Sequence, residues 1–203
     1  MTQNDGRVKI EAPLGVAQVL LHCCCAPCAG EIVEALLDSG IIPTLFFYNP
    51  NIYPRNEYEL RKKAVKDFAD KKDVAFVDGD YDDAVWAEAT AGFENEEEGG
   101  IRCEKCFFMR LSRSAQYAKE NDFKIFTSTL GISRYKNFEK VSECGHLAAK
   151  KHGIIYWDHN WRKKGGSQRM YEIAKQEKFY AQNYCGCKFS LKSRNKQEES
   201  ILK

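Results

Sequence analysis

The sequence predicts an α/β fold: a single Rossmann-like domain with a mainly parallel sheet, helices on both faces and a metal site at the carboxyl ends of the strands. Short apolar runs alternate with amphipathic helical segments along the whole chain, as they do in parallel sheets. The 203 residues are enough for one sizeable core. We expect a loose N-terminal extension over residues 1–14, the catalytic α/β domain over 15–190 and a basic tail over 191–203.

The first strand and the first helix define the expected site. Residues 16–22 (VAQVLLH) form a short apolar run, as a buried strand does. The turn HCCCAPC follows, and Pro27 suits the first turn of a helix that Gly40 ends. In parallel sheets ligands bind just beyond the strands, and a helix N-terminus favours thiolates. The sequence therefore predicts a binding loop at this turn.

The remaining elements repeat the alternation. Further strands are expected over residues 43–48, 74–81, 123–130 and 153–157. Further helices are expected over residues 57–71, 82–92, 99–122, 138–152 and 167–182. In the first of these helices the apolar side chains recur with helical spacing and so share one face.

Composition and charge limit the function classes. Hydrophobic residues make up 43% of the chain, which excludes a disordered protein. No run approaches the roughly 20 apolar residues that span a bilayer, and the polar N-terminus is not a secretory signal, so we expect a cytoplasmic protein. The net charge is only +2, yet from residue 160 onward 11 Lys or Arg face 4 Asp or Glu. This basic C-terminal quarter is a candidate phosphate-binding face.

Nine cysteines in such a chain indicate metal binding or redox chemistry, because cytosolic thiols are kept reduced. Eight of them fall into three groups: Cys23, Cys24, Cys25 and Cys28; Cys103 and Cys106; Cys185 and Cys187. Cys144 stands alone, as an ordinary buried cysteine does.

The spacing within each group bears on its chemistry. The CxxC pair Cys103 and Cys106 suits zinc sites, iron–sulfur sites and redox dithiols alike. Neighbouring cysteines of the first group serve one site only if the backbone turns between them, as it does between a strand and a helix. The CxC pair around Gly186 closes only into a strained, labile disulfide. For that pair a redox role and a metal-ligand role both stay open.

Several motifs occur in an order that resembles one enzyme family. They are HCCCAPC, YNPNIYPRNEYELRK, RCEKCF, FTSTLGISRYKN, NWRKKGGS and YCGC, and the match as a whole runs from about residue 20 to residue 190. With them the chain is similar to the cobalamin-independent epoxyqueuosine reductases (QueH). The resemblance implies an oxidoreductase that reduces epoxyqueuosine to queuosine at the anticodon wobble position of tRNA, the last step of queuosine biosynthesis. The epoxide oxygen then leaves as water, which takes two protons and two electrons from a donor that the sequence does not identify.

The resemblance also implies cofactors and the residues that hold them. A [4Fe–4S] cluster is expected on Cys24, Cys25, Cys103 and Cys106. A redox-active pair is expected at Cys185 and Cys187. The family also has a second, nearby metal, which we expect to be iron and assign to Cys28. A frame shifted by one, through Cys23 and Cys24, stays open.

The expected substrate is a base in an RNA loop, which aromatic and Arg side chains contact by stacking. Residues 157–169 combine these residue types, and the predicted tRNA contacts are Trp161, Arg162, Lys163, Lys164 and Arg169. The C-terminal residues that extend the contact are Lys192, Arg194 and Lys196. Candidate proton donors near strand ends and cysteine turns are His22, Tyr48, Asp80 and Tyr184.

Other functions compete with this hypothesis. The main alternative is a zinc-stabilised RNA-binding protein without redox activity, which would be colourless. A second is an oxidoreductase of the same metal class that acts on a free small molecule. An ATP-dependent enzyme is disfavoured, because no Gly-rich phosphate loop follows the first strand.

Overall fold

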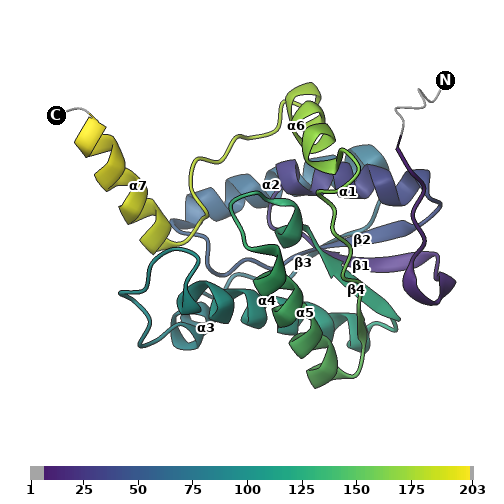
Figure 1. Cartoon of the computed structure of the whole chain (residues 1–203), viewed down its shortest axis with the longest axis horizontal. Coiled ribbons are helices and arrows are strands. Elements are labelled where there is room, and N and C mark those ends of the chain that lie inside the picture. The colour runs from purple at the N-terminus through teal and green to yellow at the C-terminus, as the bar shows by residue number, and fades with distance from the viewer. Residues whose placement is uncertain (1–6, 202–203) are drawn as a thin grey trace.

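Five parallel strands form the sheet of the computed structural model, which describes residues 7–201, with side chains up to residue 195 (Figure 1). The strands are β1 (Gln18–His22), β2 (Ile42–Phe47), β3 (Phe76–Asp78), β4 (Ile125–Ser128) and β5 (Ile155–Tyr156). Their order across the sheet is β3-β2-β1-β4-β5, and every neighbouring pair is parallel. The predicted α/β fold is therefore confirmed.

Helices cover both faces of this sheet. They are α1 (Ala26–Asp38), α2 (Arg55–Lys72), α3 (Asp83–Ala89), α4 (Ile101–Glu120), α5 (Phe138–His152), α6 (Gly166–Gln176) and α7 (Lys188–Ile201). Figure 1 shows α1, α2 and α6 above the sheet and α3, α4 and α5 below it. Accordingly α1 packs against α2 and α6, while α4 packs against α3 and α5. Helix α7 projects from the side of the body (Figure 1).

The central strand β1 marks the point where the topology reverses. From β1 the chain runs outward through β2 and β3, and then crosses back to β4 on the other side of β1. The carboxyl ends of the two strands meet, with His22 paired to Ser128. Open parallel sheets bind ligands at such a switch point. Residues Val19, Leu20 and Leu21 are fully buried because helices cover both faces, which explains the continuous apolar run.

All the predicted strands and helices are present, but the C-terminal part differs from the prediction. Helix α6 ends at Gln176, before the expected residue 182, and Lys178 then adopts a left-handed backbone with φ 52°. Helix α7 was not predicted, because its many charged residues conceal any apolar periodicity. Most of the predicted tail over 191–203 thus lies in α7, and residues 202–203 are outside the described part.

The start of the chain lies along α1. Residues 1–6 of the predicted extension are outside the described part, residues 7–12 have no regular structure, and a single 3-10 turn, η1 (Pro13–Gly15), precedes β1. Arg7 pairs with Glu31 at 3.0 Å and with Glu34 at 3.2 Å, both on α1. Among the described helices none has the length and apolar character that a membrane crossing requires.

Candidate functional site

Three cysteine thiols converge where β1 ends and α1 begins. The sulfur atoms of Cys24, Cys25 and Cys28 all lie within 4.8 Å of one another, and all three residues are buried. The Sγ atoms of Cys24 and Cys25 are 3.6 Å apart. Cys25 is extended (φ −173°) immediately before α1, and Cys28 follows in the first turn of the helix. The strand-to-helix turn therefore brings neighbouring cysteines to the same site.

Cys23 has a different environment. Its thiol donates to the carbonyl oxygen of Leu21 at 3.4 Å, and burial raises its pKa well above the usual range. It is not a member of the group that Cys24, Cys25 and Cys28 form among the described residues. Side chains alternate along an extended chain, and this alternation directs Cys23 into the core.

Cys24 has the lowest thiol pKa of the trio. Hydrogen bonds from the thiols of Cys25 and Cys28 hold its pKa well below the usual range, and the charges of Lys136 and Arg110 act in the same direction. Thr129, which follows β4, fixes it further: the Cys24 N–H donates to Thr129 Oγ1 at 3.0 Å, and that hydroxyl donates to Cys24 Sγ at 3.2 Å. A thiolate beside two further thiols is a donor set for a thiophilic metal.

The CxxC pair lies on α4, below the trio. Cys106 is buried and Cys103 is half-buried, with the Gly99 N–H donating to Cys103 Sγ at 3.2 Å. Burial raises the pKa of Cys103 to about 11, and the neighbouring sulfurs of Cys185 and Cys106 add to the effect. The pair is thus next to the YCGC segment. It is not part of the group that Cys24, Cys25 and Cys28 form among the described residues. Of the four predicted cluster ligands, Cys24 and Cys25 lie in the trio with Cys28, and Cys103 and Cys106 lie separately on α4.

The YCGC segment is held against the first turns of α2. Buried Arg61 donates from Nη1 to the Cys185 carbonyl at 3.1 Å and from Nη2 to the Tyr184 carbonyl at 3.3 Å. Arg61 also pairs with Glu57 at 2.7 Å. Gly186 accepts from the Tyr53 N–H at 2.8 Å, and its φ of 128° is a backbone conformation that favours glycine. Both cysteines of the segment are free thiols.

A large cavity lies beside the cysteine trio and the YCGC segment. Its volume is about 1050 Å³, and its wall includes the cysteine trio and Cys185. The basic residues of the wall are Arg61, Arg110, Arg134, Lys136, Lys175, Lys178 and Arg194, against the single acidic residue Glu98. Although burial opposes it, the neighbouring cysteine sulfurs raise the pKa of Lys136. The cavity therefore combines thiol chemistry with strong positive charge.

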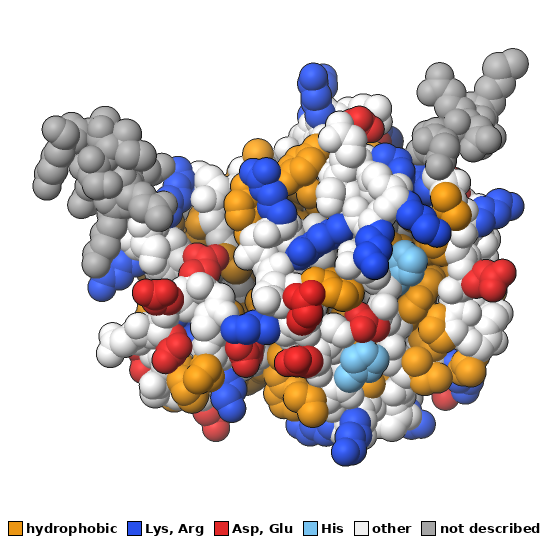
Figure 2. All heavy atoms as spheres, viewed as in Figure 1, with side chains coloured by type: hydrophobic (Ala, Val, Ile, Leu, Met, Phe, Trp, Pro, Cys, Tyr) orange, Lys and Arg blue, Asp and Glu red, His pale blue; other side chains and the backbone are white. Residues whose placement is uncertain are grey.

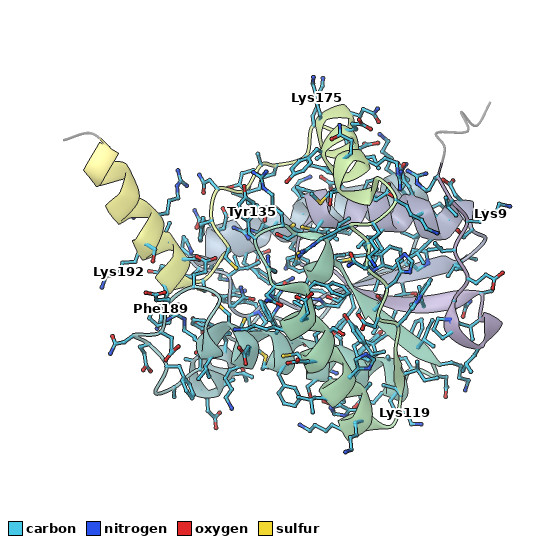
Figure 3. The ribbon with its side chains drawn as sticks, viewed as in Figure 1. Lys9, Lys119, Tyr135, Lys175, Phe189 and Lys192 are labelled. Carbon is cyan, nitrogen blue, oxygen red and sulfur yellow. The ribbon has the colours of Figure 1, made fainter. Side chains whose placement is uncertain are left out.

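The mouth of the cavity lies between α6 and α7. Figure 3 shows Tyr135 in the middle of this face, with Lys175 above it on α6 and Lys192 to the left on α7. Tyr135 is 76% exposed, and the Arg134 guanidinium lies 4.8 Å from its ring centre. Figure 2 shows Lys and Arg side chains mostly in the upper part of this face and acidic side chains mostly in the lower part. The mouth thus offers aromatic and cationic groups together.

The predicted tRNA contacts of residues 157–169 have several internal partners. Trp161 is 5% exposed. Arg162 donates to the carbonyls of Ser133 and Lys136, and so holds the loop that brings Lys136 to the cavity. Arg169 pairs with Glu31 at 2.8 Å.

The exposed members of that predicted set are Lys163 and Lys164, just before α6. Of the C-terminal extension, Arg194 lines the cavity, Lys192 is exposed, and the side chain of Lys196 is outside the described part.

The candidate proton donors differ in their burial and in their hydrogen-bond partners. His22 is fully buried between Ser128 Oγ, 2.9 Å from Nδ1, and the Tyr48 carbonyl, 3.2 Å from Nε2. Burial lowers its pKa to about 3, so it is neutral at physiological pH. The Tyr184 hydroxyl donates to the Tyr53 carbonyl. Asp80 is exposed beyond β3.

The region that matches known proteins covers nearly all of the fold described above. The family model described as epoxyqueuosine reductase QueH matches residues 19–193. This chain belongs to the QueH family. Proteins named epoxyqueuosine reductase QueH from Histophilus somni and Acinetobacter baylyi are both 53% identical to it, covering 96% and 94% of this chain and 80% and 88% of their own. The QueH protein of Thermotoga maritima is 35% identical over 90% of this chain and 95% of its own.

The residues of this QueH chain suit a metal centre bound by thiolates. Three buried thiols converge, the pKa of one of them is lowered by its neighbours, and the buried guanidinium of Arg110 has no carboxylate partner among the described residues. Anionic sulfur ligation and an unneutralised cation complement each other, since an isolated buried charge is costly. The donor set therefore fits a thiophilic metal or an iron–sulfur cluster.

Sequence reasoning missed the groups around the cysteines. Four residues contact the site or its segments although they belong to no cysteine motif: Arg110, Lys136, Thr129 and Arg61. Arg61 and Lys136 lie within QueH motifs that were recognised without a role, YNPNIYPRNEYELRK and FTSTLGISRYKN. The available signal for Arg110 was its helical spacing, four residues after Cys106.

Proposed function

We propose that this chain is an epoxyqueuosine reductase that acts on tRNA. The observation that carries the proposal is the cavity, in which a buried cysteine trio and Cys185 share a wall with seven basic residues and one acidic residue. Thiols supply reducing chemistry, and positive charge suits a polyanionic substrate. Membership of a family whose relatives are named for this activity supports the same conclusion.

The reaction balances with the thiols of Cys185, which lines the cavity, and Cys187. Epoxide removal converts a carbon–oxygen–carbon ring into a carbon–carbon double bond and releases the oxygen as water. It consumes two electrons and two protons. Oxidation of the Cys185 and Cys187 thiols to a disulfide releases two electrons and two protons. A strained CxC disulfide is readily reduced again, so the pair suits repeated turnover.

The metal part of the proposal follows the cysteine groups. We assign Cys24, Cys25, Cys103 and Cys106 to a [4Fe–4S] cluster and Cys28 to a second iron. When bound, iron supplies single-electron transfer and Lewis acidity towards the epoxide oxygen.

The chain's own cations then orient the substrate. Lys136 carries a positive charge beside the cysteine trio, where developing negative charge on the leaving oxygen requires stabilisation. Tyr135 offers an exposed ring for stacking at the mouth. Lys175 and Lys178, both exposed on the wall, suit the phosphates on either side of the modified base. Lys163 and Lys164 remain candidate outer contacts.

An anaerobic preparation tests this function. We expect brown protein containing iron and inorganic sulfide, and conversion of epoxyqueuosine to queuosine in tRNA, measured by mass spectrometry of the nucleosides. The Cys187→Ser variant should stop after at most one turnover, because the disulfide no longer forms. Colourless protein that contains zinc and binds tRNA without conversion would favour the zinc-stabilised RNA-binding alternative.

A further inference from the structure

Arg110 is a buried cation at the centre of the three cysteine groups. It is 3% exposed and lines the cavity. On α4 it follows Cys106 by four residues and Cys103 by seven, so the three side chains share one face of the helix. Electrostatic interactions link its guanidinium to the sulfur atoms of Cys24, Cys106 and Cys185.

No carboxylate neutralises Arg110 among the residues whose side chains are described. Its Nη2 donates to Asn49 Oδ1, which is a neutral acceptor, and its Nε is buried without a partner. The other two arginines of comparable burial differ. Arg61 pairs with Glu57, and Arg102 donates to three backbone carbonyls. A guanidinium taken out of water with so few acceptors requires a nearby negative charge.

The position of Arg110 is fixed through Asn49. The Asn49 Nδ2 donates to the Cys23 carbonyl at 2.9 Å, while its Oδ1 accepts from Arg110. Asn49 itself is fully buried. The backbone of the cysteine turn and the guanidinium are thereby connected through one amide, so the charge cannot move away from the sulfur atoms.

We propose that Arg110 is the counter-charge of the anionic sulfur-ligated centre and sets how readily that centre accepts an electron. This inference rests on the proposed function, because it requires a redox-active centre on these cysteines. Reduction adds negative charge to a centre that is already negative. A fixed positive charge beside it stabilises the reduced state and raises the reduction potential, as charge and hydrogen bonding do in metal centres generally. Arg110 is thus a positioning residue that acts through the centre.

The test is a potentiometric titration of iron-loaded protein, followed by its visible absorption. We expect Arg110→Gln to disfavour reduction at least about tenfold, which is a shift of about 59 mV to lower potential for one electron. Arg110→Lys should retain most of the wild-type potential, because the charge remains. Arg113→Gln is the matched control: it lies one turn further along α4, pairs with Glu120 at 3.5 Å and does not line the cavity.

The outcomes separate this inference from the proposed function. An iron-loaded Arg110→Gln variant with the wild-type potential would overturn the inference alone. If that variant loads no iron, Asn49→Asp is compared with Asn49→Leu: both lose the amide that donates to the Cys23 carbonyl, and only Asn49→Asp supplies a carboxylate that neutralises Arg110. A lower potential in Asn49→Asp than in Asn49→Leu supports the inference, and equal potentials overturn it. Wild-type protein without iron and sulfide would overturn both proposals.

Discussion

The two sides of the cavity are built in different ways. The cysteine trio lies in the turn after the central strand β1 and in the first turn of α1, and Thr129 fixes it from the turn after the neighbouring strand β4. The opposite side comes from α6 and the segment that leads to α7, which contribute the exposed Lys175 and Lys178 together with Cys185. Core elements thus hold the cysteine trio, and a less buried segment holds exposed cations. Under the proposed function, such a division allows the side with the exposed lysines to adapt to RNA while the cysteine trio stays fixed.

The largest expected difference between the two sides of the cavity comes from replacing Cys24, which should affect iron binding but not RNA binding. Replacing Cys24 with Ser removes the thiol of the trio whose pKa is lowest. We expect the affinity of the protein for iron to fall by roughly 100-fold or more, since even the loss of an outer-shell partner costs about 10–100-fold in metal affinity. Affinity for an anticodon stem-loop RNA should stay at the wild-type level. Iron analysis and an RNA-binding titration measure the two quantities.

Cys144 gives the matched control for that variant. It is also buried, and its thiol donates to the Glu104 carbonyl at 3.5 Å, away from the cavity wall. Cys144→Ser should keep the wild-type iron content. Equal iron loss in both variants would show that general destabilisation, rather than ligation, explains the result for Cys24.

A smaller effect is expected where the segment at 184–187 attaches to the core. Arg61→Lys removes the fork that reaches the carbonyls of Tyr184 and Cys185. Hydrogen bonds from charged donors contribute about 1.5–3 kcal/mol, so local opening of the segment should rise by roughly 30-fold. Hydrogen exchange of the peptide containing residues 181–187 measures this opening.

The control for Arg61 lies on the same helix. Arg55 is 71% exposed and pairs with Glu59 at 3.7 Å, so Arg55→Lys should leave the exchange unchanged. If Arg61→Lys also exchanges at the wild-type rate, the segment is held by other contacts, and the two sides of the cavity do not differ in the way described.

The sequence allowed the rigid side to be predicted much better than the charged side. The apolar run before HCCCAPC and the helix start at Pro27 are local signals, and they located the cysteine turn at the switch point. The charge of Arg162 and Arg169 is equally visible in the sequence. Their partners at Ser133 and Glu31 are not, because they are distant along the chain and only the fold brings them together.

Long-range packing also explains the other omissions. Arg110 is one of many arginines in the sequence, and only its burial beside sulfur atoms without a carboxylate distinguishes it. Helix α7 has little apolar periodicity of its own. Its first turn is held by Phe189, which packs against Trp86 at 5.9 Å between ring centres and lies 4.4 Å from the Arg102 guanidinium. Contacts of this kind leave no periodic pattern in the sequence.

The smallest effects compare two lysine pairs at opposite ends of α6. Lys175 and Lys178 line the cavity at its C-terminal end, and Lys163 and Lys164 precede its N-terminus. We expect Lys175→Gln with Lys178→Gln to weaken RNA binding about tenfold and to reduce the salt dependence by about 0.7 per lost phosphate contact. Lys163→Gln with Lys164→Gln should change the affinity by no more than about twofold, because more distant charges are screened. Binding titrations at several salt concentrations measure both, and a larger loss from the Lys163 and Lys164 pair would place the RNA on the surface that the charge of the sequence had indicated.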